Sequence, residues 1–100
     1  MAKLIKPMQL PIKYSKASPY MRKKARMEYI RLQKGLCQYC NEPLDKQPLS
    51  KVMNATINTK LFPTGFFDWP IHLHHDHNTD DTIGAVHARC NAYLWQYLGE

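Results

Sequence analysis

Four of the five histidines in this chain lie in the eleven residues IHLHHDHNTDD, from Ile71 to Asp81, together with three aspartates. Imidazole and carboxylate groups are common metal ligands, and histidine also exchanges protons near neutral pH. The stretch could therefore form a metal cage, place a general base beside a catalytic ion, or be a polar loop without chemistry. Other parts of the chain must decide between these three interpretations.

Two residue pairs elsewhere have matching spacing, Cys37-x-x-Cys40 and His87-x-x-Cys90. Zinc prefers thiolate and imidazole ligands, and a closed structural site uses four of them. A turn can bring the first pair together, and one helical turn brings residues i and i+3 of the second pair to the same side. The spacing predicts a structural Zn²⁺ site of three cysteines and one histidine. The alternatives are three reduced cysteines without metal, or a fourth ligand drawn from His72, His74, His75 and His77.

The first element that must position these residues is a helix near the N-terminus. Ser18 suits the N-cap, Pro19 suits the first helical turn, and Gly35 suits the position after the last turn. The sequence between them predicts about four turns. The expected apolar stripe contains Tyr20, Met27, Ile30 and Leu32. The expected cationic, DNA-binding face contains Arg22, Lys23, Lys24, Arg26 and Arg31.

The histidine-rich stretch lies between two predicted strands. FFDWPIHLHH is aromatic and β-branched enough to form a strand, NTDDTIG predicts a turn, and TIGAVHA predicts a second strand. RCNAYLWQYLG then predicts the last helix. Residues 45–70 predict a loop or insertion with one weak strand at Ala55–Thr59. Trp69 and Trp95 are expected in the core rather than as platforms for stacked bases.

The charge distribution indicates a polyanionic partner. Residues 1–34 hold ten of the fourteen lysines and arginines but only one of the eight acidic residues. A basic arm attached to a slightly acidic module favours nucleic acid as the partner. An odd cysteine count does not indicate a disulfide framework. No signal peptide or membrane-spanning apolar run is apparent, so we expect an intracellular protein with no membrane partner.

The order of these features resembles the HNH, or His-metal finger, nucleases, and within them the phage recombination endonuclease VII family. In that family a Cys-x-x-Cys precedes an L-D-H-D-H strand, a glycine-containing turn and a C-x-x-C-N that opens a helix. This chain has LHHDH at Leu73–His77 and IGAVHARCN at Ile83–Asn91. The resemblance covers residues 34–98, and the segment between Cys40 and Trp69 has no clear counterpart.

The resemblance implies a role for each matching residue. By position, His75 is the general base and His77 lies near the scissile phosphate. His74 stands where the family has a metal-binding aspartate, although the bacterial colicin DNases have His-His there. Asn91 matches an asparagine that helps to hold the catalytic ion or to orient the strand. The catalytic ion would be Mg²⁺, Mn²⁺ or Ni²⁺. In the separate structural zinc site, His87 replaces the first cysteine of the family's second cysteine pair.

Strand geometry raises one difficulty with these roles. Neighbours in a regular strand point to opposite faces, so His74 and His75 reach one phosphate only if the strand bends there. His72 is expected on the same face as His74 and is left without a role. Arg89 is expected either in solvent or against a phosphate.

The resemblance implies an α+β fold, a small zinc-stabilised ββα-metal, treble-clef-like finger preceded by a basic N-terminal helix. Residues 1–34 would form a basic arm and a DNA-binding helix. Residues 35–100 would form the nuclease module, and the whole chain would be one compact domain. We also expect that two copies of the chain could form a homodimer through the first helix. A phage origin would place the protein in the bacterial cytoplasm.

Two functions are compatible with this pattern. The first is a metal-dependent DNA endonuclease that hydrolyses phosphodiester bonds, because a histidine base and one divalent ion supply the chemistry that this reaction needs. We expect nicking or relatively non-specific cleavage. The alternative is a non-catalytic, zinc-stabilised DNA-binding or adaptor module, since the basic arm and the cysteine pairs suit both functions.

Overall fold

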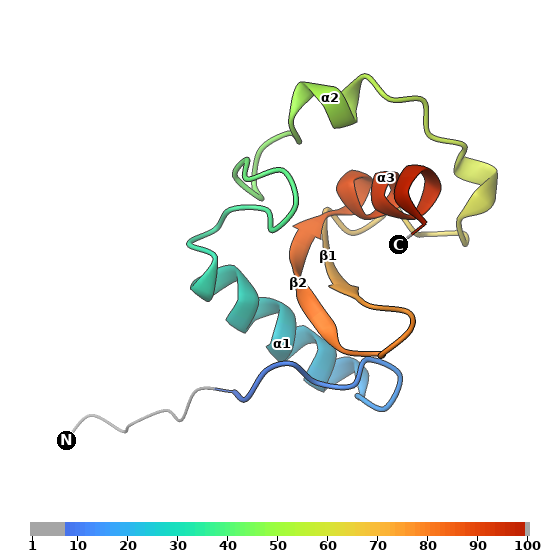
Figure 1. Ribbon diagram of the computed structural model, residues 1–100. Coiled ribbons are helices and arrows are strands. Elements are labelled where there is room, and N and C mark those ends of the chain that lie inside the picture. The colour runs from blue at the N-terminus through green and yellow to red at the C-terminus, as the bar shows by residue number, and fades with distance from the viewer. Residues whose placement is uncertain (1–7, 100) are drawn as a thin grey trace.

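The computed structural model describes residues 8–99 and shows a small α+β fold. Two strands form one antiparallel hairpin that runs between two longer helices, and residues 45–70 arc around the outer side of the last helix (Figure 1). The elements in chain order are α1 (Pro19–Leu32), α2 (Ser50–Met53), the 3₁₀ helix η1 (Thr59–Leu61), β1 (Ile71–His75), β2 (Thr82–His87) and α3 (Ala88–Leu98).

Helix α1 begins where the sequence predicts it and buries a different face. The Ser18 hydroxyl accepts a hydrogen bond from the Met21 amide at 3.1 Å, and Pro19 opens the helix. The predicted apolar stripe is largely wrong, because Met27 and Leu32 are more than half exposed, at 59% and 57%. The fully buried residue of α1 is Ala25. Its methyl side chain allows the helix backbone to approach the hairpin closely.

The hairpin holds the histidine-rich stretch. In β1 and β2, Ile71 faces His87, Leu73 faces Ala85 and His74 faces Gly84. The register shifts between His74 and His75, so His75 pairs with Thr82. Such an irregularity re-aims side chains that follow it. The strand therefore departs from regular geometry at the pair of histidines for which a bend was needed.

A side chain from the end of α1 continues the sheet beyond β2. The Gln33 amide donates to the Ala85 carbonyl and accepts from the Ala85 N–H, both at 2.9 Å. It therefore pairs with Ala85 as a neighbouring strand would. The Gln38 N–H adds a bond of 3.0 Å to the same carbonyl. These contacts hold the loop after α1 against the middle of β2.

The close approach of this loop makes Gly84 a sensitive position. A Cβ atom at Gly84 would lie 2.8 Å from both Gln33 Oε1 and Gln38 Cγ. We expect Gly84→Ala to lower the free energy of unfolding by about 1–3 kcal/mol, the usual cost of overpacking. Urea unfolding measures this change. The conservative Ile83→Val, on the exposed neighbour in β2, is the control.

The direction of the Gly84 effect distinguishes two causes. Gly84 does not have a left-handed φ angle, so backbone entropy alone would make alanine stabilising by about 0.4–1 kcal/mol. A Gly84→Ala protein as stable as the parent would contradict the steric contact.

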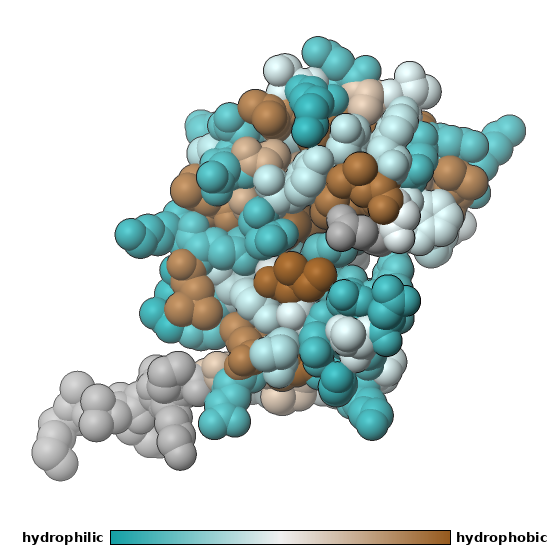
Figure 2. Space-filling view, in the orientation of Figure 1, coloured by the Kyte–Doolittle hydropathy of each residue, from teal (hydrophilic) through white to brown (hydrophobic). Residues whose placement is uncertain are grey.

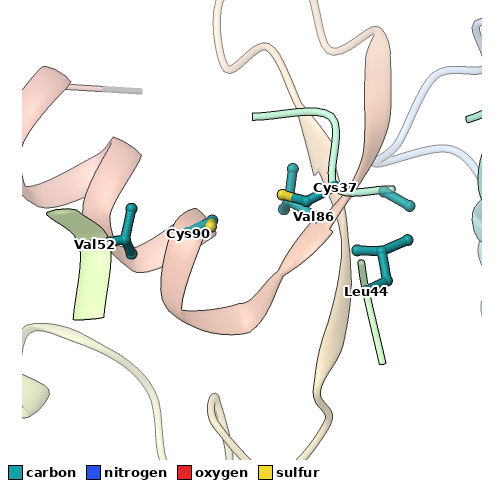
Figure 3. Close-up of a cluster of buried hydrophobic side chains, with 6 residues drawn as sticks. Cys37, Leu44, Val52, Val86 and Cys90 are labelled. Carbon is teal, nitrogen blue, oxygen red and sulfur yellow. The ribbon is translucent and has the colours of Figure 1, made fainter. Parts of the chain in front are cut away.

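The core is small and includes two of the cysteines. Cys37, Leu44, Val52, Val86 and Cys90 are buried together between the loop after α1, β2, α2 and α3 (Figure 3). A core of this size stabilises a chain only marginally. The free energy that holds the fold must therefore include a further contribution.

The predicted strand at Ala55–Thr59 is wrong. Side chains of α3, rather than a neighbouring strand, bond to the backbone there: the Gln96 amide bonds to the Asn58 N–H and the Thr56 carbonyl, and the Tyr97 hydroxyl donates to that same carbonyl. The Arg89 guanidinium donates to the carbonyls of Val52, Met53 and Ala55. Arg89 therefore holds the end of α2, a role that differs from both expectations for it.

The described part of the predicted N-terminal arm lies against the hairpin instead of extending away from it. Tyr14 donates its N–H to the Asp80 carbonyl at 2.9 Å, and the Thr82 N–H donates to the Ile12 carbonyl at 3.0 Å. The Asp80 carboxylate accepts from the Ser15 hydroxyl at 2.6 Å, and Lys13 pairs with Asp81 at 2.8 Å. Residues 1–7 of the arm lie outside the described residues.

On the face seen in Figure 2, the described residues form no broad apolar area. There, hydrophobic residues form small groups separated by hydrophilic ones. Within residues 8–99, no helix is long and apolar enough to cross a membrane.

Candidate functional site

The four predicted zinc ligands come together at one end of the hairpin. Cys37 and Cys40 lie on the turn after α1, His87 ends β2, and Cys90 is in the first turn of α3. Their ligand atoms all lie within 4.8 Å of one another. His87 Nδ1 is 3.5 Å from the sulfur atoms of both Cys40 and Cys90. This confirms a Cys₃His cluster that could hold a metal ion such as Zn²⁺.

A hydrogen bond on the far side of the imidazole sets which nitrogen can bind metal. His87 Nε2 lies 2.9 Å from the Pro43 carbonyl oxygen. A carbonyl can only accept, so Nε2 must carry the proton and Nδ1 keeps its lone pair. Nδ1 is the nitrogen that faces the sulfur atoms. Metal-binding histidines are commonly oriented by such a bond.

Backbone groups and neighbouring thiols favour negative charge at Cys37. Its pKa is lowered to about 4, chiefly by a hydrogen bond from the Cys90 side chain and also by the backbone N–H groups of Cys40 and Tyr39. The pKa of Cys90 is raised because it neighbours the Cys37 thiolate and is itself desolvated. The cluster therefore favours one thiolate, at Cys37, and disfavours a second, at Cys90. A divalent cation would favour both thiolates because it attracts each of them.

A groove that none of the four cluster residues lines collects most of the remaining candidate residues. It measures about 660 Å³ and lies between α1, residues 61–69, β1 and α3. Its floor includes three of the four clustered histidines, and its lining from α1 includes Arg22 and Arg26. The floor residues that bear on chemistry are His72, His75, His77 and Asn91.

His74 is placed differently from its neighbours. Its side chain is only 4% exposed, and it borders a separate hollow of about 130 Å³. His75 and His77 border both hollows. Neighbouring residues of a strand point to opposite faces, so ordinary alternation already accounts for the separation of His74 from the groove that His75 lines.

Asn91 contacts His72, the histidine for which the sequence predicts no role. Its amide nitrogen donates to His72 Nδ1 at 3.1 Å. Burial lowers the pKa of His72, and the edge of its ring packs against Phe66 with the centroids 4.6 Å apart. His72 and Asn91 therefore form a hydrogen-bonded pair on the floor of the groove. His74 and Asn91, the ligands implied for a catalytic ion, border different hollows.

His75 is held by the N-terminal segment. The Tyr14 ring stacks on the imidazole with the centroids 3.9 Å apart and the planes 5° from parallel. The Arg22 guanidinium lies 4.1 Å from the Tyr14 centroid, and its Nε donates to the Tyr14 carbonyl. Burial lowers the pKa of His75, with a further contribution from His77, whose ring is 4.7 Å away. His75 is therefore largely neutral at neutral pH, as a proton acceptor must be.

The stack predicts a measurable effect of Tyr14 on His75. We expect Tyr14→Ala to raise the pKa of His75 toward the ordinary histidine value, because water then reaches the ring face that Tyr14 covers. Tyr14→Phe keeps an aromatic ring there and should leave the pKa near that of the parent. An NMR titration of the imidazole measures both variants, and equal pKa values in the alanine variant and the parent would contradict the role of the stack.

The five cations of the predicted DNA-binding face differ in their surroundings. Arg22 and Arg26 are half-buried and line the groove, whereas Lys23 and Lys24 are exposed. The Arg31 guanidinium pairs with the Glu28 carboxylate one turn earlier. The pKa of Glu28 is lowered by this hydrogen bond. Arg22 and Arg26 are therefore the two cations of α1 best placed to meet a phosphate in the groove.

The expectation that Trp69 and Trp95 lie in the core is wrong. Trp69 is 73% exposed and Trp95 is 43% exposed, and both line the groove. They sit on or against the irregular segment before β1, which has too few buried positions to cover rings of this size. Sequence reasoning also missed Tyr14 and Gln33, whose partners are more than fifty residues away and leave no local signal.

Comparison with known protein families, with curated proteins and with solved structures finds no match for this chain. Its function must therefore be inferred from the Cys₃His cluster and the groove.

Proposed function

We propose that the protein is a metal-dependent DNA endonuclease of the HNH type, built on a ββα-metal, treble-clef-like finger with Zn²⁺ at the Cys₃His cluster. The observation that carries the proposal is the meeting of a neutral histidine, His75, with Arg22 and Arg26 in one groove. Phosphodiester hydrolysis needs a proton acceptor near neutral pH and positive charge on the phosphate. The groove supplies both.

In the proposed reaction, His75 accepts a proton from a water molecule as the water oxygen attacks phosphorus. A new P–O bond forms, the bond to the leaving sugar oxygen breaks, and that oxygen takes a proton from solvent. Arg22 and Arg26 bind the negative oxygens of the phosphate. His77, whose ring lies 4.7 Å from that of His75, would contact the same phosphate.

A catalytic divalent ion is part of the proposal by resemblance. Mg²⁺, Mn²⁺ or Ni²⁺ would stabilise charge on the phosphate and the leaving oxygen as a Lewis acid. His74 is its implied imidazole ligand, and His75 and His77 border the same hollow as His74. Asn91 is hydrogen-bonded to His72. In this arrangement Asn91 therefore acts directly on His72, at the floor of the groove.

Cleavage of plasmid DNA tests the proposal. Zinc-loaded protein is incubated with supercoiled, linear and branched DNA and with each divalent ion in turn. The proposal expects nicked or linear product that needs an added ion. DNA binding without cleavage under any of these conditions would instead support the alternative, a zinc-stabilised DNA-binding or adaptor module, which the cations of α1 favour equally.

A homodimer through α1 is a further part of the proposal. The helix exposes four large apolar side chains, those of Tyr20, Met21, Met27 and Leu32. Contact between two copies of α1 would cover them.

A further inference from the structure

One wall of the groove is aromatic. Phe62, Phe66 and Trp95 form a cluster in which Phe62 lies 4.7 Å from Phe66 and 5.6 Å from Trp95 between ring centroids. Trp69 lines the same groove and is 73% exposed. A tryptophan loses favourable burial energy when it is exposed to this extent. Exposed aromatic surface at the edge of a groove is typical of a binding site.

The lining from α1 carries positive charge. Arg22 and Arg26 are one helical turn apart, and both line the groove. Arg22 is held in place by its bond to the Tyr14 carbonyl and its stacking on the Tyr14 ring. A ligand of this groove should therefore carry negative charge toward α1 and flat, uncharged surface toward Trp69.

Unpaired nucleotides have this distribution of properties, and duplex DNA does not. In a duplex both faces of each base are covered by its neighbours, so a tryptophan has no base face to stack on. In a single strand the bases are free to stack on aromatic side chains while the phosphates bind cations. The groove also has the volume of an ordinary ligand pocket, about 300–1,000 Å³, which suits a short stretch of one strand.

We propose that the groove binds an unpaired segment of DNA, with a base stacked on Trp69 and the adjoining phosphates on Arg22 and Arg26. The inference rests on the proposed function for DNA as the nucleic acid. It deepens that function by naming the substrate class as single-stranded or locally unpaired DNA. Trp69 is then a specificity-determining residue, separate in role from the proton acceptor His75 that lines the same groove.

Equilibrium binding tests this inference without requiring cleavage. The zinc-loaded full chain is titrated, with no other divalent ion, into labelled oligothymidine of about twelve nucleotides, within the usual range of single-strand site sizes. A duplex of the same length is the comparison. We expect the parent to bind the single strand more tightly. Trp69→Ala should weaken single-strand binding by about 5- to 150-fold, the value of one stacked base, and change duplex binding little.

Trp69→Phe is the matched control because it keeps a ring at the same exposed position. It should retain most of the affinity for the single strand. Unchanged single-strand affinity in Trp69→Ala, or an equal loss for single strand and duplex, would overturn the inference. Tighter binding of oligouridine of the same length would assign the groove to RNA and overturn the choice of DNA.

The outcomes separate this inference from the proposed function. Plasmid cleavage by a Trp69→Ala protein with the parent's single-strand affinity would leave the endonuclease standing and remove the unpaired-strand groove. Selective loss of single-strand binding in Trp69→Ala, combined with no cleavage by the parent, would do the reverse.

Discussion

Replacement of Cys90, a proposed Zn²⁺ ligand, by serine (Cys90→Ser) is expected to abolish the folded structure at room temperature. Cys37 and Cys90 belong to the small buried core that also contains Val86 and Val52 (Figure 3). Structural zinc sites contribute about 10–16 kcal/mol of apparent binding free energy, which is as large as the usual total stability of about 5–15 kcal/mol. Circular dichroism and bound-zinc analysis measure the loss.

Two controls separate metal loss from ordinary core damage. Val52→Ala removes buried methyl groups beside the cluster without removing a ligand, so it should cost at most roughly 3 kcal/mol and retain zinc. Chelation of the parent's metal should reproduce the Cys90→Ser result. A parent protein that melts at the same temperature with and without metal would contradict a structural role for the cluster.

Replacement of the proposed proton acceptor is expected to have the second large effect. His75→Ala should reduce the rate of DNA cleavage by about 10²- to 10⁴-fold, the usual contribution of general base catalysis. The fold should persist because His75 is half-buried and lies at the opposite end of the hairpin from the Cys₃His cluster. Single-turnover cleavage measures the rate, and zinc content verifies the fold.

Gln47→Ala is the control, because Gln47 is exposed and lines neither the groove nor the hollow beside His74. It should cleave at the parent's rate. Equal cleavage by His75→Ala and the parent would remove His75 from the reaction.

The pH dependence of cleavage provides an independent readout of the same residue. Burial and the neighbouring His77 lower the pKa of His75, which favours its neutral form. The base is active when neutral, so the rate should rise with pH through a value below the ordinary histidine pKa and then level off. Tyr14→Ala should move this rise to higher pH, whereas His75→Ala should abolish it.

The Cys₃His cluster, the hairpin and both long helices could be predicted because their signals are local. The Cys-x-x-Cys and His-x-x-Cys pairs carry their geometry in their spacing. Ser18 and Pro19 mark the start of α1 through bonds made within one turn. The approximate β1 and β2 segments follow from β-branched and aromatic composition.

The faces of these elements were harder to predict because they depend on distant contacts. Ala25 is the buried residue of α1 because the hairpin lies close to it, and composition alone favours the larger Met27 and Leu32. The register shift at His75 depends on how β1 pairs with β2, and it is not apparent from the alternation of side chains along β1. The insertion has no regular spacing of hydrophobic residues that would predict which side chains are buried. The exposure of Trp69 therefore follows only from the three-dimensional path of residues 61–69.

The way in which α3 holds the insertion has a consequence for protein engineering. The hydrogen bonds of Arg89, Gln96 and Tyr97 to residues 52–58 are made to main-chain atoms, so they do not depend on which side chains that segment carries. Apart from the buried Val52, the segment can therefore change its composition while these bonds persist. Residues 61–69, which follow it and bear the aromatic wall, become a natural place to exchange sequences and so to redirect substrate choice without redesigning the metal centre.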